Sequence, residues 1–122
     1  IKSATSIDGK NWKREGKVCI DFESKSENAL ARPYVINENN VYKMWFSYKG
    51  EAYKIGYAES LDGINWIRSN DCQETLSPSK DKDKFDSKMV EYAAVLRHKG
   101  RLIMLYNGDN YGHGGIGVAI QE

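Results

Sequence analysis

The sequence predicts an all-β fold built from antiparallel four-stranded β-propeller blades. Short stretches of β-type residues alternate with Asn- and Gly-containing turns, which is typical of an antiparallel meander. The sequence also repeats itself: residues 6–12 recur at 60–66, and residues 55–58 recur at 116–119. A repeat of about 54–61 residues with about four strands in each copy predicts propeller blades.

The repeat divides the chain into three groups of expected strands. Residues 30–70 form a full blade, with strands at 31–36, 41–48, 53–60 and 65–69. A blade remnant precedes it and an incomplete blade follows it: residues 1–20, with strands at 2–6 and 11–18, and residues 89–122, with strands at 90–97, 101–106 and 115–120. Residues 1–122 are therefore expected to form a single partial propeller domain of about two and a quarter blades.

The turns between these strands have a consistent chemistry. The sequence Ser-x-Asp-Gly-x-Asn-Trp occurs at 6–12 and at 60–66. Its Ser and Asp side chains can cap backbone amides in a tight turn, and its glycine can adopt positive φ. The tryptophan can then fold over the turn. Both copies are expected to be structural. The segment 79–84, Ser-Lys-Asp-Lys-Asp-Lys, predicts a solvated loop within the linker before the last blade.

Composition and charge bound the partners. The net charge is +1, from 18 basic and 17 acidic residues, so nothing favours nucleic acid or an anionic membrane surface. No apolar run approaches the ~20 residues of a membrane span. Cys19 and Cys72 are expected to be free thiols, and no metal or other cofactor is expected. Unpaired cysteines without a visible signal peptide favour a cytoplasmic location, although the sequence starts at Ile1 rather than Met.

Three motifs of the middle blade carry a family resemblance: Ala-Arg-Pro-Tyr-Val at 31–35, Tyr-Lys-Met-Trp-Phe-Ser-Tyr at 42–48 and Ile-Gly-Tyr-Ala-Glu-Ser at 55–60. They resemble the five-bladed propeller glycosidases of glycoside hydrolase families 43, 32 and 130. Residues 85–89 and 106–112 resemble the C-terminal blades of uncharacterised glycosidase-like proteins of that class. The resemblance covers almost the whole chain and implies a carbohydrate ligand on the axial face.

The candidate site residues lie at one end of the meander, because the first strand of a blade starts where its second strand ends. The resemblance implies carboxylic acids at or near the inner strands, and Glu91 and Asp109 are the candidate catalytic pair. The candidate ligand-binding residues are Arg32, Tyr34, Tyr92, Asn107, Asn110, Tyr111 and His113. One departure is that Arg32 precedes Pro33, where an invertase-like triplet has Asp.

Simpler alternatives stay open for these residues. Glu91 could be a strand-end surface residue or the ion-pair partner of Arg32. Arg32 could bind a sugar hydroxyl or carboxylate, or pair with an inner acid. His113, between two glycines, could be an ordinary loop residue.

The favoured hypothesis is a glycosidase-like propeller fragment that binds carbohydrate on the axial face without proven catalysis. The alternative is a glycoside hydrolase or phosphorylase whose active site is completed by another chain, and an oligomerising scaffold is a third. Self-association as a homodimer is expected, since incomplete blades leave pairable strand edges. Two chains would supply eighteen of the predicted strands, near the twenty of a five-bladed ring.

Overall fold

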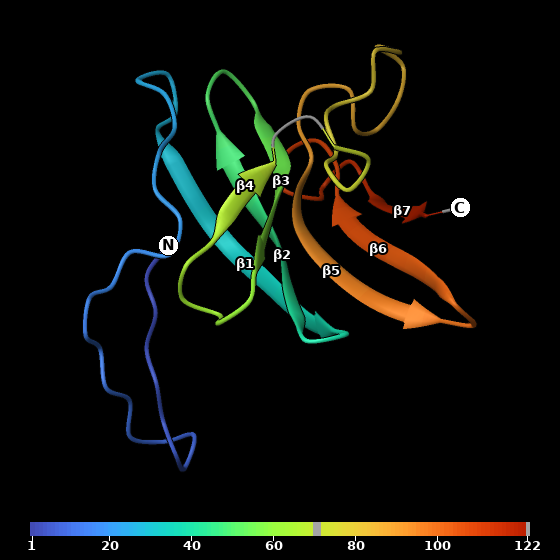
Figure 1. Ribbon diagram of the computed structural model, residues 1–122. Helices are drawn as coiled ribbons and strands as arrows, with labels where there is room; N and C mark the ends of the chain where they lie inside the picture. The colour runs from blue at the N-terminus through green and yellow to red at the C-terminus, as the bar shows by residue number, and fades with distance from the viewer. Residues whose placement is uncertain (70–71, 122) are drawn as a thin grey trace.

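The computed structural model describes residues 1–69 and 72–121, and within them the chain contains antiparallel sheets and no helix (Figure 1). The first sheet has the order β1-β2-β3-β4 and the second has the order β5-β6-β7. The strands are β1 (Ala29–Glu38), β2 (Val41–Lys49), β3 (Tyr53–Ser60), β4 (Ile67–Ser69), β5 (Glu91–His98), β6 (Arg101–Asn107) and β7 (Ile116–Ile120). The predicted all-β class is confirmed, and the two sheets are consistent with propeller-like blades.

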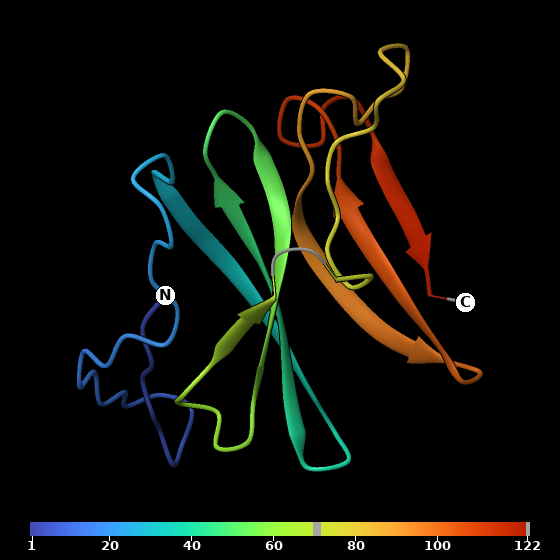
Figure 2. The same cartoon turned by 45° about the horizontal axis from the view of Figure 1, so that its top comes forward.

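The N-terminal strands predicted at 2–6 and 11–18 are wrong. This segment makes only two isolated antiparallel bridges, Lys2 with Val18 and Thr5 with Lys13. In Figure 2 it runs as a long loop beside the first sheet. Most of its residues are exposed, and an isolated two-stranded ribbon is marginal in water without a third strand to extend it. The strand predicted at 65–69 shortens to β4, because Asn65 and Trp66 donate hydrogen bonds within the preceding turn, to Asp62 and Gly63.

The two sheets pack face to face through one apolar core. Trp45, Ile55 and Tyr57 of the first sheet meet a group from the second sheet and the residue before it: Val90, Ala93, Val95, Leu102, Met104 and Tyr106. Because side chains alternate along a strand, the neighbours of Trp45 on β2 point to the opposite face of the first sheet. There Met44 and Phe46 form a second cluster with Ala58 and Ile20, which Ile1 and Trp66 help to cover.

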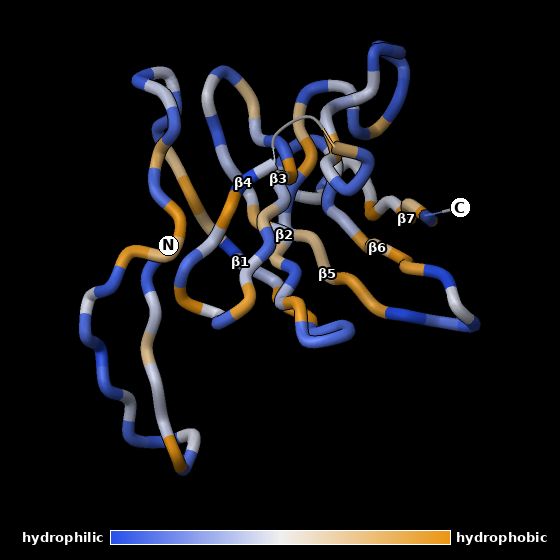
Figure 3. Tube along the Cα trace, in the orientation of Figure 1, coloured by the Kyte–Doolittle hydropathy of each residue, from blue (hydrophilic) through white to orange (hydrophobic). Residues whose placement is uncertain are grey.

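Hydropathy follows this packing. Figure 3 shows hydrophobic stretches along the strands, whereas the loop that protrudes beyond β5 and β6 is largely hydrophilic. Residues 80–84 of that loop are exposed, as the charged run at 79–84 predicts.

The two Asp-Gly-x-Asn-Trp turns have the same hydrogen bonds. The Asp62 carboxylate accepts the backbone N–H groups of Ile64 and Asn65 at 2.8 and 2.7 Å, which holds the pKa of Asp62 well below its usual range. The Trp66 indole N–H donates to the carbonyl of Gly63 at 3.1 Å. Asp8 and Trp12 repeat these bonds in the first copy. The geometry supports the structural role expected of both turns.

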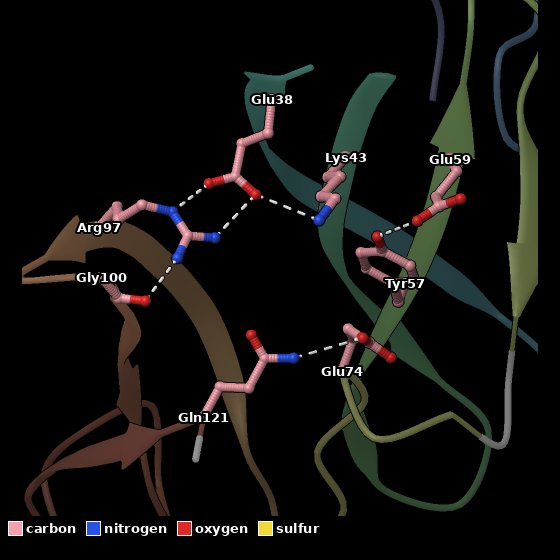
Figure 4. Close-up of polar contacts among 8 residues, drawn as sticks. All are labelled: Glu38, Lys43, Tyr57, Glu59, Glu74, Arg97, Gly100 and Gln121. Carbon is pink, nitrogen blue, oxygen red and sulfur yellow. Dashed lines mark hydrogen bonds and ion pairs between the residues drawn. The ribbon is translucent and has the colours of Figure 1, made fainter. Parts of the chain in front are cut away.

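An ionic cluster joins the two sheets at the end opposite the β5 N-terminus (Figure 4). Glu38 of β1 accepts hydrogen bonds from the Arg97 guanidinium of β5, one of them from Nη2 at 2.9 Å. The same carboxylate pairs with Lys43 Nζ at 3.1 Å. Arg97 lowers the pKa of Glu38 most, and despite the opposing effect of burial that pKa falls to about 2.

The Glu38 cluster predicts a pH dependence. A carboxyl group whose pKa is lower in the folded than in the unfolded chain adds stability above its unfolded pKa, near 4.5, and loses it as the pH falls toward 2. Glu38→Gln should therefore cost roughly 1 kcal/mol of unfolding free energy at pH 7, as a partly exposed ion-pair network does. Urea denaturation should show this difference shrinking between pH 5 and pH 2. A difference independent of pH would contradict the assignment.

Candidate functional site

The first strands of the two sheets carry a β-bulge at equivalent positions of the repeat. The register of β1 against β2 shifts between Ala31 and Tyr34, and that of β5 against β6 shifts between Glu91 and Ala94. Arg32 and Tyr92 lie inside these bulges, with φ of 51° and 57°. Bulges re-aim side chains and are common beside active sites. Since β1 and β5 contact each other, both bulges belong to one region of the molecule.

Glu91 is the unusual residue of this region. Its exposure is 0%, and neither carboxylate oxygen has a hydrogen-bond partner among the described residues. Its neighbours fix the backbone: Val90 N–H donates to the Tyr53 carbonyl at 3.1 Å, and Tyr92 N–H donates to Ser47 Oγ at 2.9 Å. The strand-end surface alternative for Glu91 is therefore wrong.

The environment of Glu91 favours its protonated form. Burial raises the pKa of Glu91, while the Tyr92 hydroxyl, which is near the carboxyl group but outside hydrogen-bond geometry, lowers it by less. No ion pair with Arg32 exists among the described residues, so the pairing alternative is not observed either. A buried carboxyl without a partner costs free energy, and it is the kind of group that a bound ligand can satisfy.

Tyrosine rings lie near Glu91, and two cations lie over those rings. The Arg32 guanidinium lies over the Tyr92 ring, 5.4 Å from its centroid. Tyr53 and Tyr111 meet edge to face with centroids 6.2 Å apart, and Lys49 Nζ lies 5.4 Å from the centroid of Tyr53. Burial raises the pKa of Tyr53, and the nearby Tyr111 and Glu91 raise it further.

We call this group the bulge cluster: Arg32, Lys49, Tyr53, Glu91, Tyr92 and Tyr111. Sequence reasoning selected four of its members and missed Lys49 and Tyr53. These two flank the short β2–β3 turn, which is the counterpart of the loop between β6 and β7 that supplied Tyr111. The repeat itself was therefore the signal that could have found them.

Asp109 has a different role in the geometry. Its Oδ1 accepts the backbone N–H groups of Lys88 and Met89 at 2.7 and 3.0 Å, and its Oδ2 accepts the Ser87 hydroxyl at 3.3 Å. Burial raises the pKa of Asp109, but these bonds lower it by more, so the net shift is downward. The carboxylate thus holds the segment that leads into β5. Its predicted catalytic role stays a prediction.

The remaining candidates lie around the cluster. Asn107 Nδ2 donates to the carbonyl of Tyr111 at 3.3 Å, which supports the loop that carries this ring. His113 and Asn110 are exposed, and the backbone N–H of His113 donates to the Asn110 carbonyl at 3.1 Å. Tyr34 lies on β1 beyond the bulge. In the described part of the chain, no side-chain hydrogen bond joins these last three to the bulge cluster.

We also searched the described residues for metal sites, paired cysteines and membrane-spanning helices. In residues 1–69 and 72–121, no three His, Cys, Asp or Glu side chains come together as a metal site. Cys19 and Cys72 are half-buried and unpaired, as expected. The described residues also contain no helix long and apolar enough to cross a membrane.

The sequence matches no protein family model. It is 41% identical over 123 residues to the uncharacterized protein Rv1502 of Mycobacterium tuberculosis strain H37Rv. It is 40% identical over 123 residues to the uncharacterized protein MT1551 of strain CDC 1551. Each alignment covers 100% of this chain, which spans about 40% of the length of these curated relatives.

Solved structures are more informative about the fold. A glycoside hydrolase aligns with a TM-score of 0.77 at 23% identity, covering 98% of this chain and 34% of its own. This chain has a glycosidase-like fold. A structure of BT0996 in an RGII complex aligns with a TM-score of 0.73 at 24% identity, and the alignment covers 96% of this chain and 33% of that one. Zg3597, a family 117 glycoside hydrolase of Zobellia galactanivorans, aligns with a TM-score of 0.56 at 17% identity, and the alignment covers 78% of this chain and 34% of that one. Identities this low show the glycosidase-like fold alone.

Proposed function

We propose that this chain is a glycosidase-like β-propeller fragment, of the five-bladed type seen in glycoside hydrolase families 43, 32 and 130, and that it binds carbohydrate at the bulge cluster. The observation that carries the proposal is Glu91, fully buried beside a strand bulge with both carboxylate oxygens unpartnered among the described residues. Two further points support the proposal. The fold is glycosidase-like, and strand bulges are common beside the ligand sites of β-proteins.

The cluster has the two kinds of group that sugars need. The rings of Tyr53 and Tyr111 offer apolar faces and edges for the C–H surface of a pyranose. The Glu91 carboxyl, when protonated, supplies one donor and further acceptor capacity for a hydroxyl. The Arg32 guanidinium supplies a planar set of N–H donors, and stacking on Tyr92 restricts its orientation.

A second candidate is catalysis, as a glycoside hydrolase or phosphorylase whose active site is completed by another chain. The raised pKa of Glu91 favours it, because a general acid must carry its proton near neutral pH. Glycoside cleavage uses a pair of carboxyl groups across the scissile bond. Since both Asp109 oxygens are engaged by the segment before β5, the second carboxylate would come from the other chain.

Binding can be tested by chemical-shift mapping with mixed oligosaccharides. We expect perturbations at Arg32, Tyr92 and Tyr111, and an affinity about tenfold lower in Glu91→Leu, which removes both the donor and the acceptor of the carboxyl group. Glu15→Leu, in the exposed N-terminal segment, is the matched control and should bind normally. Perturbations confined to the turns at Gly9 and Gly63 would place the ligand elsewhere and overturn the proposal.

Catalysis needs a separate assay. A panel of aryl-glycosides, with and without inorganic phosphate, should release aryl alcohol only if the second candidate holds. In that case Glu91→Gln should reduce the rate by at least about 100-fold, as loss of a general acid does. Turnover that survives this substitution would exclude Glu91 as the acid.

We also propose that a second copy of this chain covers the outer face of the second sheet. Leu105, Ile116 and Val118 are exposed there by 39%, 69% and 59%. In the sequence repeat they correspond to Trp45, Ile55 and Tyr57 of the first sheet. Those three residues are buried against the second sheet. A further sheet of the same kind therefore fits this face, and residues 11–18 of the second copy could pair with β7. The occupied site would then include residues of both copies.

A further inference from the structure

We infer that the bulge cluster selects an acidic sugar, with the Arg32 guanidinium binding the carboxylate of a hexuronic acid. This inference rests on the proposed carbohydrate function and specifies its ligand class. Arg32 is held against an aromatic ring. Its side chain leaves a left-handed bulge, is exposed to solvent, and stacks on the face of Tyr92.

Two other arginines of this chain, Arg68 and Arg97, are held by acids. Arg97 is paired with Glu38, and Arg68 donates from both Nη atoms to Glu27, at 3.1 and 2.9 Å. Arg14, Arg32 and Arg101 have no carboxylate partner among the described residues. Of these three, Arg32 is the one that stacks on an aromatic ring. Stacking uses the face of a guanidinium and leaves its N–H edge available, and that edge matches a carboxylate with two parallel hydrogen bonds.

The charge of the bulge cluster also favours an acidic ligand. Lys49 Nζ lies over Tyr53 and, within the described residues, pairs with no acid. The acid of the cluster, Glu91, is buried, and burial favours its neutral form. Nearby Asp109 is already engaged by three donors. Glu51, in the turn after Lys49, is exposed and has no ion pair in the described part of the chain. The surface presented to a ligand therefore carries an excess of positive charge.

A hexuronic acid has the chemistry that this arrangement recognises. Its carboxylate can take the N–H edge of Arg32, while its ring contacts the tyrosines. A neutral sugar leaves the Arg32 edge with only hydroxyl partners, which form weaker hydrogen bonds with a guanidinium than a carboxylate does. The cluster should then discriminate between two sugars that differ only at this group.

The test is an NMR titration of the full 122-residue chain with matched methyl glycosides. Glucose, galactose and mannose are each compared with the corresponding uronic acid, and with the 6-phosphate. We expect at least one uronic acid to bind about tenfold more tightly than its neutral parent. Arg32→Gln should remove that preference, Arg32→Lys should keep only part of it, and Arg101→Gln, an exposed control on β6, should keep all of it.

The outcomes separate the two proposals. Equal affinity for acidic and neutral sugars would overturn the acidic preference and leave carbohydrate binding intact. Tighter binding of the 6-phosphates would overturn the carboxylate assignment. A preference that survives Arg32→Gln would overturn the role of Arg32. No binding of any sugar would overturn both proposals. Amide shifts of β1 and β2 in the free variants check that each one is folded.

Discussion

Replacing Trp45 by alanine should lower the free energy of unfolding by about 3–5 kcal/mol, the range typical of a buried tryptophan truncation. The side chain is 2% exposed and lies in the core between the two sheets. Its ring packs against Tyr57 with centroids 5.2 Å apart. Its indole N–H donates to the carbonyl of Glu74 at 3.1 Å, so the substitution also leaves a carbonyl of the linker without its donor.

The matched control is Trp12→Ala. Trp12 is 58% exposed and makes one local hydrogen bond, to the carbonyl of Gly9 at 3.2 Å. Its removal should cost less than about 1 kcal/mol, as exposed substitutions do. Urea denaturation followed by circular dichroism measures both values. Similar losses for the two variants would mean that the sheets are not held together by the Trp45 core.

The strands predicted most accurately are those with a clear turn on each side. The expected strand at 53–60 has the bounds of β3, and the one at 41–48 differs from β2 by one residue. The Asn-Asn turn before β2 explains this success. Asn39 and Asn40 both adopt positive φ, 53° and 64°, as a two-residue hairpin turn requires. Local chemistry was enough because it fixed the register.

The N-terminal segment shows what local chemistry cannot decide. Residues 2–18 have strand-like stretches and the same turn motif as residues 60–66. A ladder, however, also needs neighbouring strands, and here only the bridges of Lys2 and Thr5 form. The alternation of apolar and polar residues shows which face of a segment could be buried. It does not show whether a partner strand lies beside that segment, because this depends on the rest of the fold.

The Ile-Gly pair that recurs in the sequence has a structural reason that the sequence alone did not reveal. Gly56 and Gly117 occupy equivalent positions, opposite Phe46 and Tyr106 on the neighbouring strands. A Cβ on Gly56 would lie 2.7 Å from Phe46 Cζ, and one on Gly117 would lie 2.2 Å from Tyr106 Cζ. Each aromatic ring therefore lies directly over a glycine, which is the physical reason for the repeated Ile-Gly motif.

The candidate site was predictable in position but not in detail. The meander placed Arg32, Glu91 and Tyr92 at one end of the sheets, and the structure brings Arg32 and Tyr92 into contact. The burial of Glu91 follows the alternation of β5, where Ala93 and Val95 are also buried, whereas its residue type alone predicts an exposed side chain. The engagement of Asp109 depends on a contact with residues about twenty positions earlier in the chain.

Sedimentation at micromolar concentration should show a dimer or a larger species, and Val118→Lys should weaken that association by at least tenfold. Val118 lies on the exposed outer face of β7, beside Leu105 on β6, its partner in the ladder. The repeat places it where Tyr57 is buried in the first sheet. Burying a lysine ammonium in an apolar interface costs several kcal/mol, because the charge loses its hydration without gaining a partner.

The control is Leu61→Lys, in the turn after β3. Leu61 is 81% exposed and is not part of either core cluster, so the same charge there should leave the association unchanged. Deleting residues 1–18 is a less specific test, because Ile1 packs on the Met44 and Phe46 cluster and its loss would uncover the first sheet. A stable monomer at these concentrations would contradict self-association. The outer face of the second sheet would then be the docking surface of a different polypeptide segment with the same strand chemistry.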